Sequence, residues 1–90
     1  MTADSKPRLA RGCRLSEDPA QGWVLLIPEG VLRLSGPGPR ILARCDGART
    51  FAEIVRELEQ EFQAGGEARV EAETSAFLER LVARRVVVVD

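Results

Sequence analysis

The sequence contains no histidine and no tyrosine, and its 90 residues include only two cysteines, Cys13 and Cys45. Without histidine there is no Ser–His or Cys–His nucleophile pair and no imidazole to act as a general base or metal ligand. Two separated cysteines lack the spacing of a zinc or iron–sulfur site and are too few for a disulfide scaffold. We therefore interpret both as small buried hydrophobic residues, and we expect no metal site and no cofactor.

Other catalytic patterns are also missing. The carboxylates Asp18, Glu29 and Asp46 lie beside turns, where acidic side chains commonly accept backbone N–H groups, so we interpret them as turn and cap residues. The glycine-rich residues 35–40 lack the phosphate-binding pattern G-x-x-x-x-G-K-[ST], and their prolines remove N–H donors that such a loop needs. We expect that the protein is not an enzyme.

Long hydrophobic runs and an excess of positive charge are absent as well. The longest apolar runs, residues 23–27 and 86–89, are far too short to span a membrane, and the first residues have no apolar segment typical of a signal peptide. We therefore expect a cytoplasmic protein that does not contact a membrane. The formal net charge of −1 provides no basic field to attract nucleic acid.

The first third of the chain shows the hydrophobic pattern of β-strands. Residues 1–8 are polar and predict a disordered tail, whereas residues 9–90 are long enough for one domain with a modest core. Residues 13–15, 23–27 and 31–34 predict three short strands joined by tight turns, and therefore an antiparallel sheet. Trp23 lies in a strand that is apolar on both faces, so we expect it in the core.

The rest of the chain follows a helical period. A short helix is expected over residues 39–45, and a second begins at a capping box of Thr50 and Glu53. The second helix is predicted to bury residues at helical spacing: Phe51, Ile54, Val55, Leu58 and Phe62. A third helix is expected over residues 71–85, followed by a strand over residues 86–89. This order predicts an α+β, winged-helix-like fold in which a three-stranded antiparallel sheet precedes three helices and a short C-terminal strand.

Two adjacent helices joined by a short link resemble a DNA-binding helix-turn-helix. The charges argue against that function, because residues 50–61 carry four glutamates and a single arginine. The third helix also begins with Glu71 and Glu73, where a recognition helix normally contacts bases. We therefore expect no nucleic-acid partner.

Several segments together resemble the PqqD family of pyrroloquinoline quinone (PQQ) biosynthesis. The most specific are the L-L-x-P-E turn of residues 25–29 and the C-D-G-x-R-T junction of residues 45–50. The likeness runs from about Arg11 to Val87 and includes residues 11–15, 23–29, 41–50, 53–55 and 77–81.

The resemblance implies a peptide chaperone without catalytic activity. Family members bind the ribosomally made precursor peptide PqqA and present it to the radical-SAM enzyme PqqE. The same fold serves as a leader-recognition domain in many enzymes that modify ribosomal peptides. The resemblance therefore implies PqqA and PqqE as partners.

The predicted fold has a surface suited to this role, because a small sheet has open edges to which an extended peptide can add as a strand. We expect PqqA to pair with the strand of residues 31–34 and to rest against the third helix. The expected peptide-binding residues are Val31, Leu32, Arg33, Leu34, Phe77, Arg80, Leu81 and Arg84. Helical spacing alone leaves it open whether Phe77 and Leu81 line a groove or belong to the core.

Two further interpretations remain open at this stage. The same fold can serve as a general protein-interaction module in an unrelated complex. Open sheet edges and a terminal strand of four valines also allow a homodimer, with or without exchange of strands.

Overall fold

The computed structural model describes residues 1–62 and 67–89, and for residues 62, 67 and 68 it describes the backbone without the side chain. The burial predicted for Phe62 therefore lies outside the described side chains. The elements in chain order are β1 (Pro7–Leu9), β2 (Arg14–Asp18), β3 (Gly22–Ile27), β4 (Gly30–Arg33), α1 (Gly38–Ala43), α2 (Phe51–Phe62), α3 (Glu67–Ala83) and β5 (Val87–Val89).

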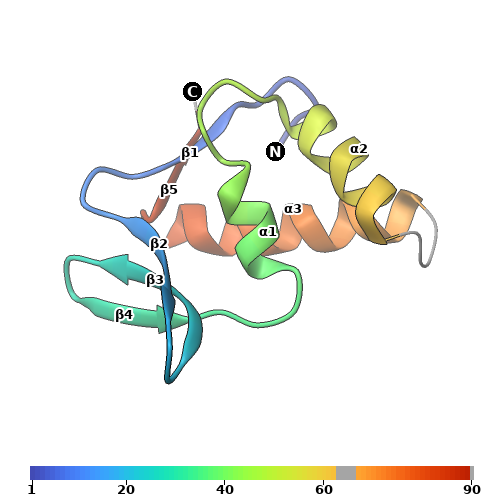
Figure 1. Ribbon diagram of the computed structural model, residues 1–90. Coiled ribbons are helices and arrows are strands. Elements are labelled where there is room, and N and C mark those ends of the chain that lie inside the picture. Colours follow the sequence, from blue (N-terminus) through green and yellow to red (C-terminus); the bar gives the residue numbers. More distant parts are fainter. Residues whose placement is uncertain (63–66, 90) are drawn as a thin grey trace.

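A three-stranded antiparallel sheet in the order β2–β3–β4 occupies one end of the molecule, and α2 lies at the other (Figure 1). Helix α3 crosses the space between them and packs against both α2 and β5. Leu25 is paired with Leu15 on one side and with Leu32 on the other. The structure confirms the predicted α+β fold with three helices after the sheet and a strand at the C-terminus.

The N-terminal segment differs from the disordered tail predicted for residues 1–8. Strand β1 pairs with β5 in a separate two-stranded sheet, and Pro7 is fully buried. The carbonyls of Ser5 and Ala3 accept hydrogen bonds from the N–H groups of Phe51 at 2.7 Å and Ala52 at 3.0 Å. The first N–H groups of a helix have no partner within the helix, so the polar segment has a defined place at the start of α2.

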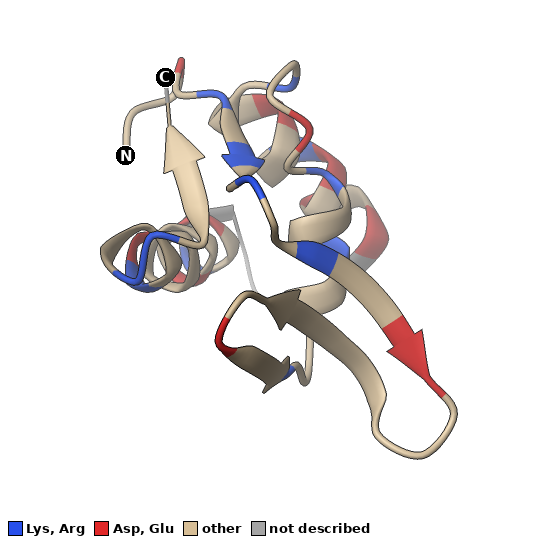
Figure 2. Cartoon of the chain, turned by 90° about the vertical axis from the view of Figure 1, so that its left-hand side faces the viewer, with Lys and Arg blue, Asp and Glu red and all other residues tan. Residues whose placement is uncertain are grey.

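The core forms between one face of the three-stranded sheet and the helices. Its buried members are Leu25, Ile41, Leu42, Cys45, Phe51, Ile54, Val55, Leu58, Leu78, Leu81, Val86 and Val87. Trp23 is not among them and is 40% exposed, so the prediction of a core tryptophan was wrong. The reason is its place in the hairpin: Trp23 pairs with Glu17 close to the β2–β3 turn, which projects away from the helices (Figures 1 and 2).

The start of α2 has the predicted capping box. The N–H of Thr50 donates to Glu53 Oε1 at 2.8 Å, and the N–H of Glu53 donates to Thr50 Oγ1 at 3.2 Å. Together with the carbonyls of residues 3 and 5, this box supplies acceptors for the first three N–H groups of the helix. The N-terminus of α2 is therefore closed both by its own capping box and by the distant N-terminal segment.

A network of ion pairs holds α1 and the following loop against α2. Arg44 donates from Nε to Glu57 Oε1 at 2.8 Å and from Nη2 to Glu61 Oε2 at 2.9 Å. Arg49 bridges Glu57 Oε2 at 3.0 Å and Asp46 Oδ2 at 2.7 Å. The hydrogen bond from Arg44, followed by that from Arg49, holds the pKa of Glu57 below its ordinary value. The network orients the helices that support the sheet.

The interpretation of Asp18 and Asp46 as turn residues is confirmed. Asp18 Oδ1 accepts the N–H groups of residues 20 and 21, and Asp46 Oδ1 accepts those of residues 48 and 49. Cys45 is buried, and burial raises the pKa of its thiol to about 12, whereas Cys13 is only half-buried. A thiol with a raised pKa forms little thiolate, so Cys45 acts as a packing residue.

Substitution of Gly47 and Gly22 measures how much stability a side chain costs at two tight turns. Both have a φ of +78°, a conformation that costs a residue with a side chain about 1–2 kcal/mol. A Cβ atom at Gly47 would lie 3.3 Å from Arg8 Cδ, whereas one at Gly22 would have no neighbour within 4 Å. We expect Gly22→Ala to lower the free energy of unfolding in urea by about 1–2 kcal/mol and Gly47→Ala to lower it further. Equal losses would show that Arg8 moves aside without cost.

Candidate functional site

Strand β4 is an open edge of the three-stranded sheet. It pairs with β3 on one side, and no strand of the described chain pairs with its other side. An unpaired row of backbone N–H and C=O groups favours the addition of another strand. The edge strand predicted over residues 31–34 is therefore present, with bounds of Gly30–Arg33.

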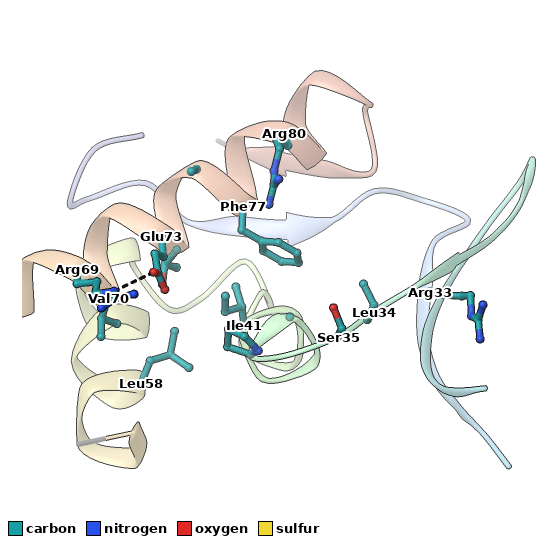
Figure 3. Close-up of a pocket in the computed structure, with 14 residues that line it drawn as sticks. Arg33, Leu34, Ser35, Ile41, Leu58, Arg69, Val70, Glu73, Phe77 and Arg80 are labelled. Carbon is teal, nitrogen blue, oxygen red and sulfur yellow. Dashed lines mark hydrogen bonds and ion pairs between the residues drawn. The ribbon is translucent and has the colours of Figure 1, made fainter. Parts of the chain in front are cut away.

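A cavity of about 830 Å³ opens at the C-terminal end of this edge, next to Arg33 and Leu34. It lies between the segment that joins β4 to α1 and the facing side of α3 (Figure 3). Its lining residues are Arg33, Leu34, Ser35, Pro37, Gly38, Ile41, Leu58, Arg69, Val70, Glu73, Thr74, Ala76, Phe77 and Arg80. The edge and the cavity together form one continuous candidate site, which we call the edge groove.

The interior of the edge groove is apolar and its rim is charged. Ile41 and Leu58 are buried at its floor, and the ring of Phe77 points from α3 toward the segment after β4 (Figure 3). Arg80 extends from α3 beside this ring, while Arg69 pairs with Glu73 at 3.2 Å on the same helix. Such a surface suits a ligand that has apolar side chains and at least one negative charge.

The predicted binding residues divide into four groups. Arg33, Leu34, Phe77 and Arg80 line the cavity of the edge groove, with the Arg33 side chain directed away from it (Figure 3), and Val31 and Leu32 lie on its edge strand. Leu81 is only 7% exposed and belongs to the core, so the structure does not bring it into the groove. Arg84 is exposed but does not line the cavity.

Several groove residues were missed by sequence reasoning. Helix α3 begins at Glu67 and not at residue 71, so Arg69 and Val70 are helical and reach the cavity. Gly38, in a stretch that sequence reasoning set aside, is buried against Phe77, and a Cβ atom there would lie 3.3 Å from the Phe77 ring. The dense glycine and proline of residues 36–39 were the available signal for this close approach.

Acidic residues are denser on α2 than on the edge strand. Figure 2 shows several along α2, whereas β4 itself carries one basic residue, Arg33, and no acidic one; Glu29 lies in the turn before β4, and Glu73 lines the cavity beside Arg69 and Arg80. A negatively charged ligand therefore meets less repulsion at the edge groove than at the surface of α2.

Within residues 1–62 and 67–89, no helix has the length and apolar character needed to cross a bilayer. In the same part of the chain, no three His, Cys, Asp or Glu side chains are grouped so that they could hold a metal ion.

Comparisons with known proteins agree on one family. Residues 22–87 match the family model described as coenzyme PQQ synthesis protein D (PqqD). The chain is 39% identical over 87 residues to a PqqA binding protein of Xanthomonas axonopodis pv. citri (strain 306), covering 96% of this chain and 94% of the relative. The chain belongs to the PqqD family.

Two solved structures are similar to the chain. One is the solution NMR structure of the PqqD truncation of Methylobacterium extorquens PqqCD, a stand-alone recognition element for ribosomally synthesized and post-translationally modified peptides. It has 34% identity and a TM-score of 0.81, with 98% of this chain and 93% of that chain covered. The other, the crystal structure of PqqD from Xanthomonas campestris, has 33% identity and a TM-score of 0.59, with 96% of each chain covered.

The different burial of Phe77 and Leu81 can be measured without a ligand. Leu81→Ala removes a core side chain, and we expect it to lower the free energy of unfolding by about 2–5 kcal/mol. Phe77→Ala should cost less, because Phe77 is half-buried and its ring faces the cavity. Urea denaturation of both variants tests this order. A loss for Phe77→Ala as large as that for Leu81→Ala would identify Phe77 as a core residue.

Proposed function

We propose that this protein is a peptide chaperone of PQQ biosynthesis that binds the precursor peptide PqqA and presents it to the radical-SAM enzyme PqqE, without catalysing a reaction itself. The observation that carries the proposal is the open edge of β4 directly beside an apolar cavity. Residues 9–90 act as the peptide-binding domain together with the N-terminal segment, which packs against it through β1 and the start of α2. The site of action is the cytoplasm, where a ribosomally made precursor peptide is released.

The edge groove can hold an extended peptide by two kinds of contact. The free N–H and C=O groups of β4 bond to the peptide backbone whatever its sequence. Those side chains of the bound peptide that point toward α3 enter the cavity next to Leu34 and Phe77. Burial of apolar surface contributes about 25 cal/mol per Å², so the cavity supplies affinity that an edge strand alone lacks.

The proposed role also requires a surface that remains free when the peptide is bound. A peptide on β4 occupies the groove between the sheet and α3, and it leaves the exposed face of α2 uncovered (Figure 1). This division supports a chaperone that holds PqqA on one side while another side stays available to PqqE.

Two arginines of α3 provide a matched test of the peptide site. Arg80 lines the cavity and Arg84, one turn further along the chain, is exposed outside it. We expect Arg80→Ala to weaken the binding of synthetic PqqA several-fold, and Arg84→Ala to weaken it less, in isothermal titration calorimetry. NMR titration of the labelled wild-type protein should show shifts concentrated on β4 and α3.

The titration also separates the proposal from its alternative. Absence of shifts at several hundred micromolar PqqA would refute the assignment to PQQ biosynthesis. The fold would then belong to an interaction module with a different partner. Equal losses for Arg80→Ala and Arg84→Ala would mean that the peptide extends along α3 beyond the cavity.

We further propose that the open edges of the sheet allow a homodimer. The edges of β2 and β4 have no further strand among the described residues, and a second copy can pair there as a peptide does. We expect light scattering to give a mass above that of one chain at high micromolar concentration, and PqqA to lower it if the dimer uses β4. A mass of one chain under all conditions would contradict the dimer.

A further inference from the structure

The hydrogen-bond pattern of the hairpin identifies which backbone groups of β4 are free. The N–H of Leu34 donates to the carbonyl of Trp23 at 3.0 Å, directly beyond the end of β4. In an antiparallel pair the N–H and C=O groups of successive residues point alternately toward the partner strand and away from it. Leu32 and Leu34 therefore direct these groups toward β3, whereas Val31 and Arg33 direct theirs toward the open edge.

Side chains alternate along β4 in the same way. Leu32 and Leu34 pack against the core, so Val31 and Arg33 lie on the outer face of the sheet. Val31 is 50% exposed, and Figure 3 shows Arg33 directed away from the cavity while Leu34 is directed toward it. The residues with free backbone groups are therefore also those whose side chains face away from the cavity.

An added antiparallel strand would continue the cross-strand rows of the sheet. One row on the outer face contains Arg14, Leu26 and Val31, and the next contains Ser16, Val24 and Arg33. A peptide residue opposite Val31 extends a row whose nearest members are apolar. A peptide residue opposite Arg33 lies beside a guanidinium that forms no ion pair with any described residue.

We infer that β4 selects a peptide strand in which an acidic residue, placed opposite Arg33 on the outer face, is flanked by two apolar residues on the inner face, of which the one opposite Leu34 enters the cavity. From its N-terminus to its C-terminus, an antiparallel peptide would place an apolar residue opposite Leu34 and an acidic residue opposite Arg33. Apolar residues would follow opposite Leu32 and opposite Val31. This inference rests on the proposed peptide-binding function and adds to it, for an antiparallel peptide, the register and the residue that selects for charge.

The chemistry of Arg33 supports this selection. An opposite charge directly across a strand pair stabilises the pair, and a like charge destabilises it. The peptide position opposite Leu34 meets Leu34 and Phe77, and the one opposite Leu32 lies on the face that packs against the core, so a charge at either position would be costly to bury. The same strand therefore favours a charge on one face and excludes it on the other.

A first experiment tests the register of the edge. Val31→Pro removes an N–H group that points to the open edge, and proline is tolerated on an edge strand when its missing N–H faces outward. We expect this variant to keep its thermal stability within a few degrees but to bind PqqA at least tenfold more weakly. Leu32→Pro removes an N–H group that points toward β3, so it should lower the stability. A folded Val31→Pro variant with wild-type affinity would overturn the register.

A charge exchange tests the selection by Arg33. Synthetic PqqA peptides, each with one Asp or Glu replaced by Lys, are titrated against the wild type and the Arg33→Glu variant. We expect one substitution to weaken binding to the wild type about tenfold, as for like charges facing each other across strands. That same peptide should bind Arg33→Glu more tightly than unmodified PqqA does, and its lysine should have apolar residues on both sides.

Arg14→Glu is the matched control, because Arg14 lies on the same outer face but on the far strand, β2. We expect the Arg14→Glu variant to bind none of the lysine-substituted peptides more tightly than it binds unmodified PqqA. If the wild type binds PqqA but no lysine peptide prefers Arg33→Glu, the selection by Arg33 is refuted while the peptide-binding function stands. If the wild type binds no PqqA at all, the proposed function fails and the inference fails with it.

Discussion

A β-strand can direct only every second side chain toward a core, and every second backbone group toward a neighbouring strand. In β4 these two alternations coincide. The residues that pack inward, Leu32 and Leu34, are also joined to β3, and the residues that face outward, Val31 and Arg33, have free backbone groups. Leu32 and Leu34 therefore hold the strand in the sheet, while Val31 and Arg33 leave their backbone groups available to a binding partner. The binding of a partner at this edge does not compete with the contacts that maintain the sheet.

The remainder of the chain positions this edge rather than contributing to it. The buried face of α2 supports α1 and α3, while the ion pairs of Arg44 and Arg49 fix the short α1 against α2. Helix α1 follows the edge strand after residues 34–37, and its residues Gly38 and Ile41 line the cavity. Gly38 lies at this point, where the close approach to Phe77 leaves room for no larger residue without displacement of the ring. The packing of α1 against α2, together with the approach of Gly38 to Phe77, therefore shapes the cavity.

Local patterns predicted most of the fold, and contacts across the chain account for what they missed. The spacing of Phe51, Ile54 and Leu58 identified α2, and the pairing of Thr50 with Glu53 identified its start, because both depend on residues within a few positions of each other. Half of the predicted binding residues line the cavity, and two more lie on the edge strand, for the same reason: an edge strand and a helix face can be recognised locally. The burial of Leu81, the exposure of Trp23 and the approach of Gly38 depend on how distant elements pack, which spacing within one element does not determine.

The backbone carbonyls of Ala3 and Ser5 accept hydrogen bonds at the start of α2, and such contacts do not depend on which residue types occupy these two positions. Every residue type carries a backbone carbonyl, so these positions can change side chain without loss of the hydrogen bonds. A segment of this kind can vary freely among relatives and still occupy one place in the fold. The match to the family model begins at residue 22, although the preceding residues contribute β1, β2 and these two carbonyls to the fold. The start of that match therefore does not mark the start of the folded unit.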